Sequence, residues 1–317
     1  MDAAAERTLV SPKIPKPKKS KITRRTMKLY VMVLPVTVLM FLFHYLPIYG
    51  IVIAFQDYSP FAGVFKSTWV GLKHFTYFLT DDSFWRVFKN TVILSCYDII
   101  FGFPAPLVFA LLVNEVMRLR FKKVIQTISY LPHFLSWVVV AGVFGQILSP
   151  NGGVVNIILH NAFNIDPIYF LSKSEWFRST VVLIEIWKGV GWGAILYFSI
   201  MAGIDPTQYE AVIIDGGGKI KQALHVTLPA LVPVIVINLV FRLSSIFSVG
   251  FERIFLLQTP LVYDVSDVIS TYIYRMGLSG GQFSATAAIG LAQSLLGFIL
   301  LTVANKVSKI ITGYGIY

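Results

Sequence analysis

The sequence is poor in the residues that build catalytic, redox and nucleotide-binding sites. It has one cysteine, Cys96, in an apolar stretch, so no disulfide framework can form. Its histidines are scattered without metal-ligand spacing, and no G-x-x-x-x-G-K-[ST] loop is present to bind a nucleotide. We therefore expect no enzyme site, no metal and no cofactor within this chain.

Charge is scarce as well. Only 14% of the residues are charged and 56% are hydrophobic, whereas soluble domains are about 25% charged and about 45–50% apolar. Both departures exclude an ordinary soluble domain and favour a protein whose surface meets a lipid bilayer.

Six apolar stretches are long enough to cross a bilayer, which takes about 20 residues of helix. They cover residues 29–55, 91–114, 124–148, 179–201, 230–250 and 283–304. Pro104 and Pro106 in the second stretch and Pro132 in the third predict kinks, which membrane helices tolerate. Gly189, Gly191 and Gly193 in the fourth predict close helix packing. The fold class is therefore an all-α membrane protein, multi-pass in the cell membrane.

The net charge of +11 is unevenly placed along the chain. Lysine and arginine gather in residues 1–25, in the short loop 118–123, in the loop 204–229 and after residue 305. Because such residues stay on the cytoplasmic side, both termini are predicted to be cytoplasmic. The basic segments carry no interleaved aromatic residues, so we expect lipid contact and no nucleic-acid partner. The three longer loops, 56–90, 149–178 and 251–282, would lie outside and present aromatic residues to an external partner.

These features predict three parts. Residues 1–25 would form a flexible basic arm, residues 26–305 the membrane domain, and residues 306–317 a short cytoplasmic tail.

The loop 204–229 carries the clearest local signals. Asp205 is a good N-cap, Pro206 suits the first helical position, and Gln208 stands where a capping box places its partner. A helix is predicted over 206–214, ended by the glycines 216–218. Tyr209, Val212 and Ile213 would share one apolar face of that helix. The face either packs on this chain's own helix ends or inserts into a groove of a cytoplasmic partner.

The same loop contains the pattern E-A-x-x-x-D-G-x(9)-V-x-L-P, which resembles the signature loop of permeases in binding-protein-dependent ABC importers. Val212 and Ala223 depart conservatively from that pattern. The resemblance implies a type I importer permease whose loop docks into a cleft of the ATP-hydrolysing subunit. The docking residues would be Tyr209, Glu210, Ala211, Val212, Ile213, Asp215, Gly216, Leu228 and Pro229.

Further stretches, 45–58, 69–75, 90–92 and 186–192, are similar to sugar-importer permeases, and the resemblance covers residues 29–305. It is strongest to permeases for complex oligosaccharides, such as fragments of alginate or pectic polysaccharides, within the maltose-importer-like class. It implies a second, homologous permease chain and an extracytoplasmic solute-binding protein as partners. It also implies two ATPase subunits that bind ATP and Mg.

Four ionisable residues, Asp98, Glu185, Lys188 and Arg242, fall inside predicted spans at similar depth, within about one helical turn. Charges there are costly and usually functional. Glu185 and Lys188 could pair with each other. The group is either a structural layer of ion pairs or the lining of a polar cavity for sugar hydroxyls or an acidic sugar. Further candidates for such a lining are Trp192, Asn238 and Gln293.

Three other readings remain open. The chain could be the permease of a similar importer for a non-sugar solute. A secondary transporter would need internal repeats or broken helices around an ion site, and no repeat relates the two halves. A membrane-anchored assembly protein would leave the intramembrane charges without a role.

Overall fold

The structure is a computed structural model that describes residues 24–316 in two units, divided after Gly50. The first unit contains α1 (Arg24–Met40), a π-helical turn η1 (Phe41–Tyr45) and the start of a 3₁₀-helix, η2 (Leu46–Phe55). The helical run Met27–Phe55 is long and apolar enough to cross a membrane, which confirms the first predicted span. The predicted basic arm lies almost wholly outside the described residues.

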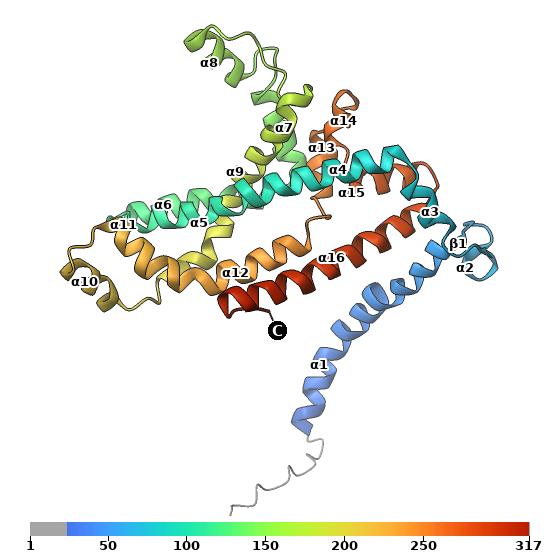
Figure 1. Cartoon of the computed structure of the whole chain (residues 1–317), viewed down its shortest axis with the longest axis horizontal. Coiled ribbons are helices and arrows are strands. Elements are labelled where there is room, and N and C mark those ends of the chain that lie inside the picture. Colours follow the sequence, from blue (N-terminus) through green and yellow to red (C-terminus); the bar gives the residue numbers. More distant parts are fainter. Residues whose placement is uncertain (1–23, 317) are drawn as a thin grey trace, which may run out of the picture. The chain divides into compact units, whose positions relative to one another are not determined.

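The second unit contains the remaining elements (Figure 1). They are β1 (Gln56–Asp57), α2 (Gly63–Lys66), β2 (Thr68–Trp69), α3 (Lys73–Leu79), α4 (Asp82–Tyr97), η3 (Asp98–Gly102), α5 (Pro104–Asn114), α6 (Leu119–Tyr130), η4 (Leu131–Phe134), α7 (Trp137–Ile147), α8 (Val154–Phe163), α9 (Ser174–Met201), α10 (Pro206–Ile214), α11 (Lys219–Gln222), η5 (Ala223–Thr227), α12 (Leu228–Ser244), α13 (Phe251–Leu257), η6 (Pro260–Val262), α14 (Tyr263–Ser266), α15 (Ile269–Ile273), η7 (Tyr274–Ser279) and α16 (Phe283–Thr312). The two short strands pair antiparallel, with Gln56 opposite Trp69.

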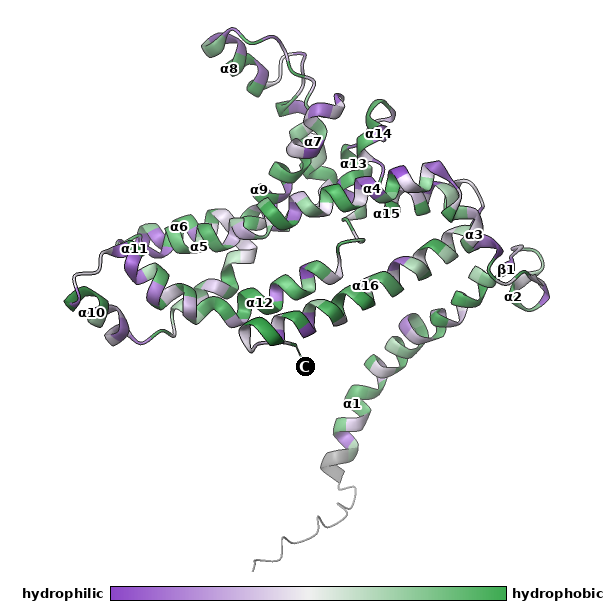
Figure 2. Ribbon diagram, in the orientation of Figure 1, coloured by the Kyte–Doolittle hydropathy of each residue, from purple (hydrophilic) through white to green (hydrophobic). Residues whose placement is uncertain are grey.

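Within the described residues, five helices are long and apolar enough to span a membrane, or six if one bent pair counts as a single span. The second begins at Asp82, earlier than hydropathy predicts, because Asp81 caps it by accepting a hydrogen bond from the Ser83 N–H at 2.9 Å. The fifth predicted span corresponds to the helix Lys219–Ser244 and so ends before residue 250. α16 continues to Thr312, beyond the predicted span. Hydrophobic residues cover most of each span (Figure 2).

The third predicted span is a broken pair and not one kinked helix. The segment Leu119–Phe134 meets Trp137–Ile147 at 103°. Pro132 lies in the 3₁₀ turn at the break, Leu135 is extended, and the Ser136 side chain caps the new helix by accepting from the Val139 N–H. In the second span, the π-helical turn η3 precedes Pro104, which begins α5.

The core of the second unit is divided into three hydrophobic clusters. One contains Leu94, Phe177 and Ile254, and joins α4, α9 and α13. Another contains Ala110, Ala194 and Leu231, and joins α5, α9 and α12. α9 therefore contributes to both clusters, and in the second it packs against α12, the helix that follows the predicted cytoplasmic loop.

Candidate functional site

The loop between α9 and α12 begins with the helix that the sequence predicts. α10 covers Pro206–Ile214, and Asp205 Oδ1 accepts a hydrogen bond from the Thr207 N–H at 2.9 Å. That hydrogen bond holds the pKa of the Asp205 carboxyl below its usual value. The predicted reciprocal bond from Gln208 does not form in the part of the chain that the structure describes, so Asp205 caps the helix alone.

Two glycines close α10, each for a different reason. Gly216 has φ +73°, a conformation that costs glycine little. A Cβ on Gly217 would lie 2.4 Å from Cγ1 of Val212. Their N–H groups donate to the carbonyls of Ile213 and Val212 at 2.9 and 2.7 Å. The prediction that glycines end this helix is confirmed.

The predicted apolar face of α10 is split in the structure. Tyr209 and Val212 are half-buried, and the Tyr209 hydroxyl is 3.1 Å from Thr227 Oγ1, so both side chains pack on the loop itself. Ile213 is 57% exposed, and the neighbouring Ile214, which the sequence did not single out, is 84% exposed. The apolar surface left for a partner is therefore Ile213 and Ile214, without Tyr209 and Val212.

The other predicted docking residues lie around this surface. Glu210, Ala211, Asp215 and Gly216 are exposed, and at the start of α12 Pro229 is exposed while Leu228 is half-buried. Lys219 forms an ion pair with Glu115 at 3.2 Å, which ties the loop to the residue that follows α5.

Asp98 and Glu185, the carboxylates within the predicted spans, share one cation. That cation is Arg253, which lies in a predicted external loop. Arg253 on α13 donates to Oδ1 and Oδ2 of Asp98 at 3.1 and 2.8 Å, and its Nη1 is 3.4 Å from Oε2 of Glu185. Arg253 is 3% exposed. Its signal in the sequence is the neighbouring Ile254 and Leu257, which are also buried and mark α13 as an inward-facing helix.

Lys188 does not pair with Glu185, so that prediction is wrong. Its Nζ donates to the His133 carbonyl at 2.7 Å and lies 5.5 Å from the ring centroid of Trp137. His133 belongs to η4, where the third span breaks and a carbonyl loses its helical donor. Lys188 therefore stabilises the break. Trp192 stacks on the His133 ring with centroids 4.4 Å apart.

Arg242 lies between two adjoining cavities of about 240 and 500 Å³, both of which it lines together with Ser245. Asp98 and Glu185 line the smaller cavity with Arg253, and Trp192, Tyr197 and Asn238 line the larger. No carboxylate within residues 24–316 forms an ion pair with Arg242, although Asp98 and Glu185 line the smaller cavity with it.

The structure thus gathers five of the predicted pathway residues around these two cavities and separates the other two. Lys188 lines neither cavity. Gln293 donates to the Phe247 carbonyl at 2.9 Å and to Ser248 Oγ at 3.0 Å, and lines a different cavity of about 420 Å³.

Apolar spans around polar cavities, joined by a capped loop with an exposed apolar surface, define a polytopic transport subunit. The family described as "Binding-protein-dependent transport system inner membrane component" matches residues 75–311, and the chain belongs to this family. It is a membrane permease subunit and not an enzyme.

Two curated relatives are similar to this chain over about nine-tenths of its length. The chain is 40% identical over 286 residues to Protein LplB of Bacillus subtilis (strain 168), covering 90% of each. It is 42% identical over 289 residues to the polygalacturonan/rhamnogalacturonan transport system permease protein YteP of the same organism, covering 91% of this chain and 90% of the relative.

Solved structures show the same fold. A crystal structure of a bacterial ABC transporter involved in the import of the acidic polysaccharide alginate matches with a TM-score of 0.83 and 40% identity, over 91% of this chain and 97% of that one. A second, of the alginate transporter in complex with an alginate pentasaccharide-bound periplasmic protein, matches with a TM-score of 0.84 and 39% identity, over 92% and 97%. The predicted family and type I importer permease fold are confirmed.

Proposed function

We propose that this permease forms half of the translocation route for an oligosaccharide that carries carboxylates. A second permease chain would form the other half, two ATPase subunits would bind ATP and Mg, and an extracytoplasmic binding protein would deliver the sugar. The names of relatives support this class of substrate, since polygalacturonan is a polymer of uronic acid and alginate is described as acidic.

The single observation that carries the proposal is the unpaired guanidinium of Arg242. A guanidinium fork matches a carboxylate with two parallel hydrogen bonds. Asp98 and Glu185 pair with Arg253, and neither forms an ion pair with Arg242 in the described residues, so the Arg242 guanidinium is available to an anion in the cavities. Trp192 lines the larger cavity beside it, is 47% exposed, and suits the apolar face of a sugar ring.

The exposed Ile213 and Ile214 are proposed to dock into the ATPase cleft, with Glu210, Ala211, Asp215 and Gly216 around them. An apolar helix surface outside the bilayer gains most when a partner's groove covers it. With this loop in the cytoplasm, both termini would be cytoplasmic, as the placement of basic residues predicts.

Substitution of Arg242 tests the proposal. Arg242→Ala leaves no carboxylate stranded, so the complex should assemble with normal yield. Uptake of an oligogalacturonate should fall about tenfold to a hundredfold, the cost of about 1.5–3 kcal/mol for a lost charged hydrogen bond. Uptake of a neutral oligosaccharide of equal length, if it is transported, should change far less. The measurement is binding-protein-dependent uptake into proteoliposomes, normalised to assembled complex.

Arg86→Ala is the matched control, because Arg86 is an exposed arginine on α4 that lines none of these cavities. It should leave uptake unchanged. Wild-type uptake in a well-assembled Arg242→Ala complex would remove Arg242 from the route and refute the proposed role of the cavity.

A further inference from the structure

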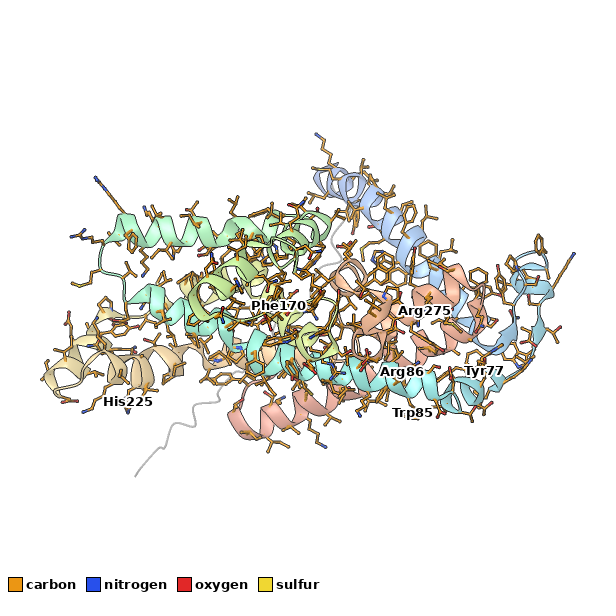
Figure 3. The ribbon with its side chains drawn as sticks, turned by 90° about the horizontal axis from the view of Figure 1, so that it is seen from above. Tyr77, Trp85, Arg86, Phe170, His225 and Arg275 are labelled. Atoms are coloured by element: carbon orange, nitrogen blue, oxygen red, sulfur yellow. The ribbon has the colours of Figure 1, made fainter. Side chains whose placement is uncertain are left out.

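A separate cavity of about 410 Å³ lies between the loop that follows the first span and the beginning of α16. One wall consists of Asp57 and Tyr58 with Lys73, His74 and Tyr77 on α3. The other consists of residues 281–285. Figure 3 shows Tyr77 at the opposite end of the second unit from His225, which belongs to the loop 204–229, the proposed docking loop. The volume is in the range of small-molecule sites, about 300–1,000 Å³.

The polar side of the cavity is a fixed cluster. Asp57 Oδ2 accepts from Lys73 Nζ at 2.7 Å, and Asp57 Oδ1 is 3.1 Å from His74 Nε2. The hydrogen bond from Lys73 holds the pKa of the Asp57 carboxyl below its usual value, so the carboxylate is ionised at neutral pH. An ammonium has three donors, and Lys73 uses one of them here. The remaining donors are available to a ligand.

The aromatic side of the cavity is held by its own contacts. The Tyr58 ring meets Phe283 edge-on with centroids 6.1 Å apart, and the Tyr58 N–H donates to Ser284 Oγ at 2.9 Å. Tyr77 is 56% exposed. Gln282 is exposed and its side chain has no hydrogen-bond partner within the described residues. The Tyr77 ring and the Gln282 amide thus line the cavity and are available to a ligand.

Neighbouring lining residues relate this cavity to the Arg242 site. Phe283 also lines the cavity that contains Gln293. Gln293 donates to Ser248 Oγ at 3.0 Å, and Ser248 lines the cavity of Arg242. Neighbouring residues therefore line the three separate cavities in turn, from the beginning of α16 to Arg242.

We propose that this cavity is an outer subsite that binds sugar units of the oligosaccharide before they reach the Arg242 cavities. Sugar rings present a C–H face to an aromatic ring and a rim of oxygens to donors, and a cavity with Tyr77 beside Lys73 and Gln282 offers both. The inference rests on the proposed function for its substrate class, and it adds a site outside the route lined by Arg242.

Protection of a single cysteine tests it. Ala285→Cys in a Cys96→Ser background is placed in the assembled complex, because Ala285 lines the cavity without contributing a polar group. The rate of maleimide labelling is measured with and without oligogalacturonate. At about ten times the dissociation constant, labelling should slow about tenfold, because only empty sites react. Phe61→Cys is the matched control, since Phe61 is fully exposed (101%) in the loop that contains Asp57 and Tyr58 and does not line the cavity.

Adding Tyr77→Ala to the Ala285→Cys complex should abolish the protection. The same preparations are assayed for oligogalacturonate uptake, which separates the two proposals. Uptake without protection overturns the outer subsite and leaves the proposed function standing, whereas the absence of both overturns the two together. Protection by the binding protein alone, without sugar, would mark a protein-docking surface and overturn the subsite.

Discussion

Arg253 is the buried cation that holds the two carboxylates of the predicted spans together. Its guanidinium contacts Asp98 and Glu185, and its Nε has no hydrogen-bond partner within residues 24–316. A buried ion pair of this kind contributes little compared with an apolar replacement of the whole group, but the loss of one partner is costly. Loss of Arg253 is therefore expected to destabilise the protein, whereas loss of Arg242 is not.

Arg253→Leu should destabilise the complex by about 3–5 kcal/mol, because it strands the buried Asp98 carboxylate and also leaves the half-buried Glu185 without its cation. The measurement is the thermal unfolding of the detergent-purified complex, with Arg242→Ala as the control that should unfold like the wild type. Adding Asp98→Asn and Glu185→Gln to Arg253→Leu should recover most of the loss. An Arg253→Leu complex with wild-type stability would show that the cluster is not desolvated.

At this scale the sequence predicts which charges matter and not how they pair. Asp98, Glu185 and Arg242 stand out because they interrupt apolar spans. Depth along a helix is one coordinate, however, and the pairing also depends on which face each residue occupies. Arg253 was left in a loop because α13 is too short to register as a span, although it turns back into the bundle.

Among the elements, α9 approaches its neighbours most closely at two of its glycines. A Cβ on Gly191 would lie 2.1 Å from the Ser129 carbonyl oxygen on α6, and one on Gly193 would lie 2.9 Å from Cγ of Pro106 on α5. Gly189 has open space around it. The prediction of close packing is thus confirmed for two of the three glycines.

Gly191→Ala should force α6 and α9 apart and lower the yield and melting temperature of the complex. Gly189→Ala is a matched control on the same helix and should be neutral or stabilising by about 0.5–1 kcal/mol, since alanine favours helix over glycine. Both are measured by thermal unfolding of purified complex. Equal melting temperatures for the two variants would contradict the close approach at Gly191.

The break in the third span depends on contacts that local sequence patterns do not predict. Pro132 predicts a kink near the right place, but the 103° angle requires Leu135 to be extended and Ser136 to cap a second helix. The His133 carbonyl at the break is satisfied by Lys188 from α9, more than fifty residues away in sequence. No local pattern contains that contact.

The helix α10 offers a direct test of docking to the ATPase subunit. Ile214→Asp places a charge on the most exposed apolar side chain of α10, so it should leave the chain in the membrane and abolish co-purification of the ATPase subunit. Leu119→Asp is the matched control, because Leu119 is 73% exposed at the start of α6. Retention of the ATPase by Ile214→Asp would exclude this surface from the interface.

On the scale of the whole molecule, the docking loop is covalently joined to two of the helices that line the cavities. α9 contributes Glu185 and Trp192 and ends at Met201, and α12 begins at Leu228 and contributes Asn238 and Arg242. A displacement of α10 by an ATPase partner would therefore act directly on two walls of the route. This connection is the physical basis for proposing that ATP hydrolysis opens and closes the cavities.

The most direct test is the uptake of labelled oligogalacturonate into proteoliposomes that contain the complete complex with its binding protein. We expect uptake that requires ATP, the binding protein and this chain, and that is lost in the Ile214→Asp complex. Uptake that persists without ATP, or with this chain alone under an ion gradient, would contradict the account and indicate a secondary transporter.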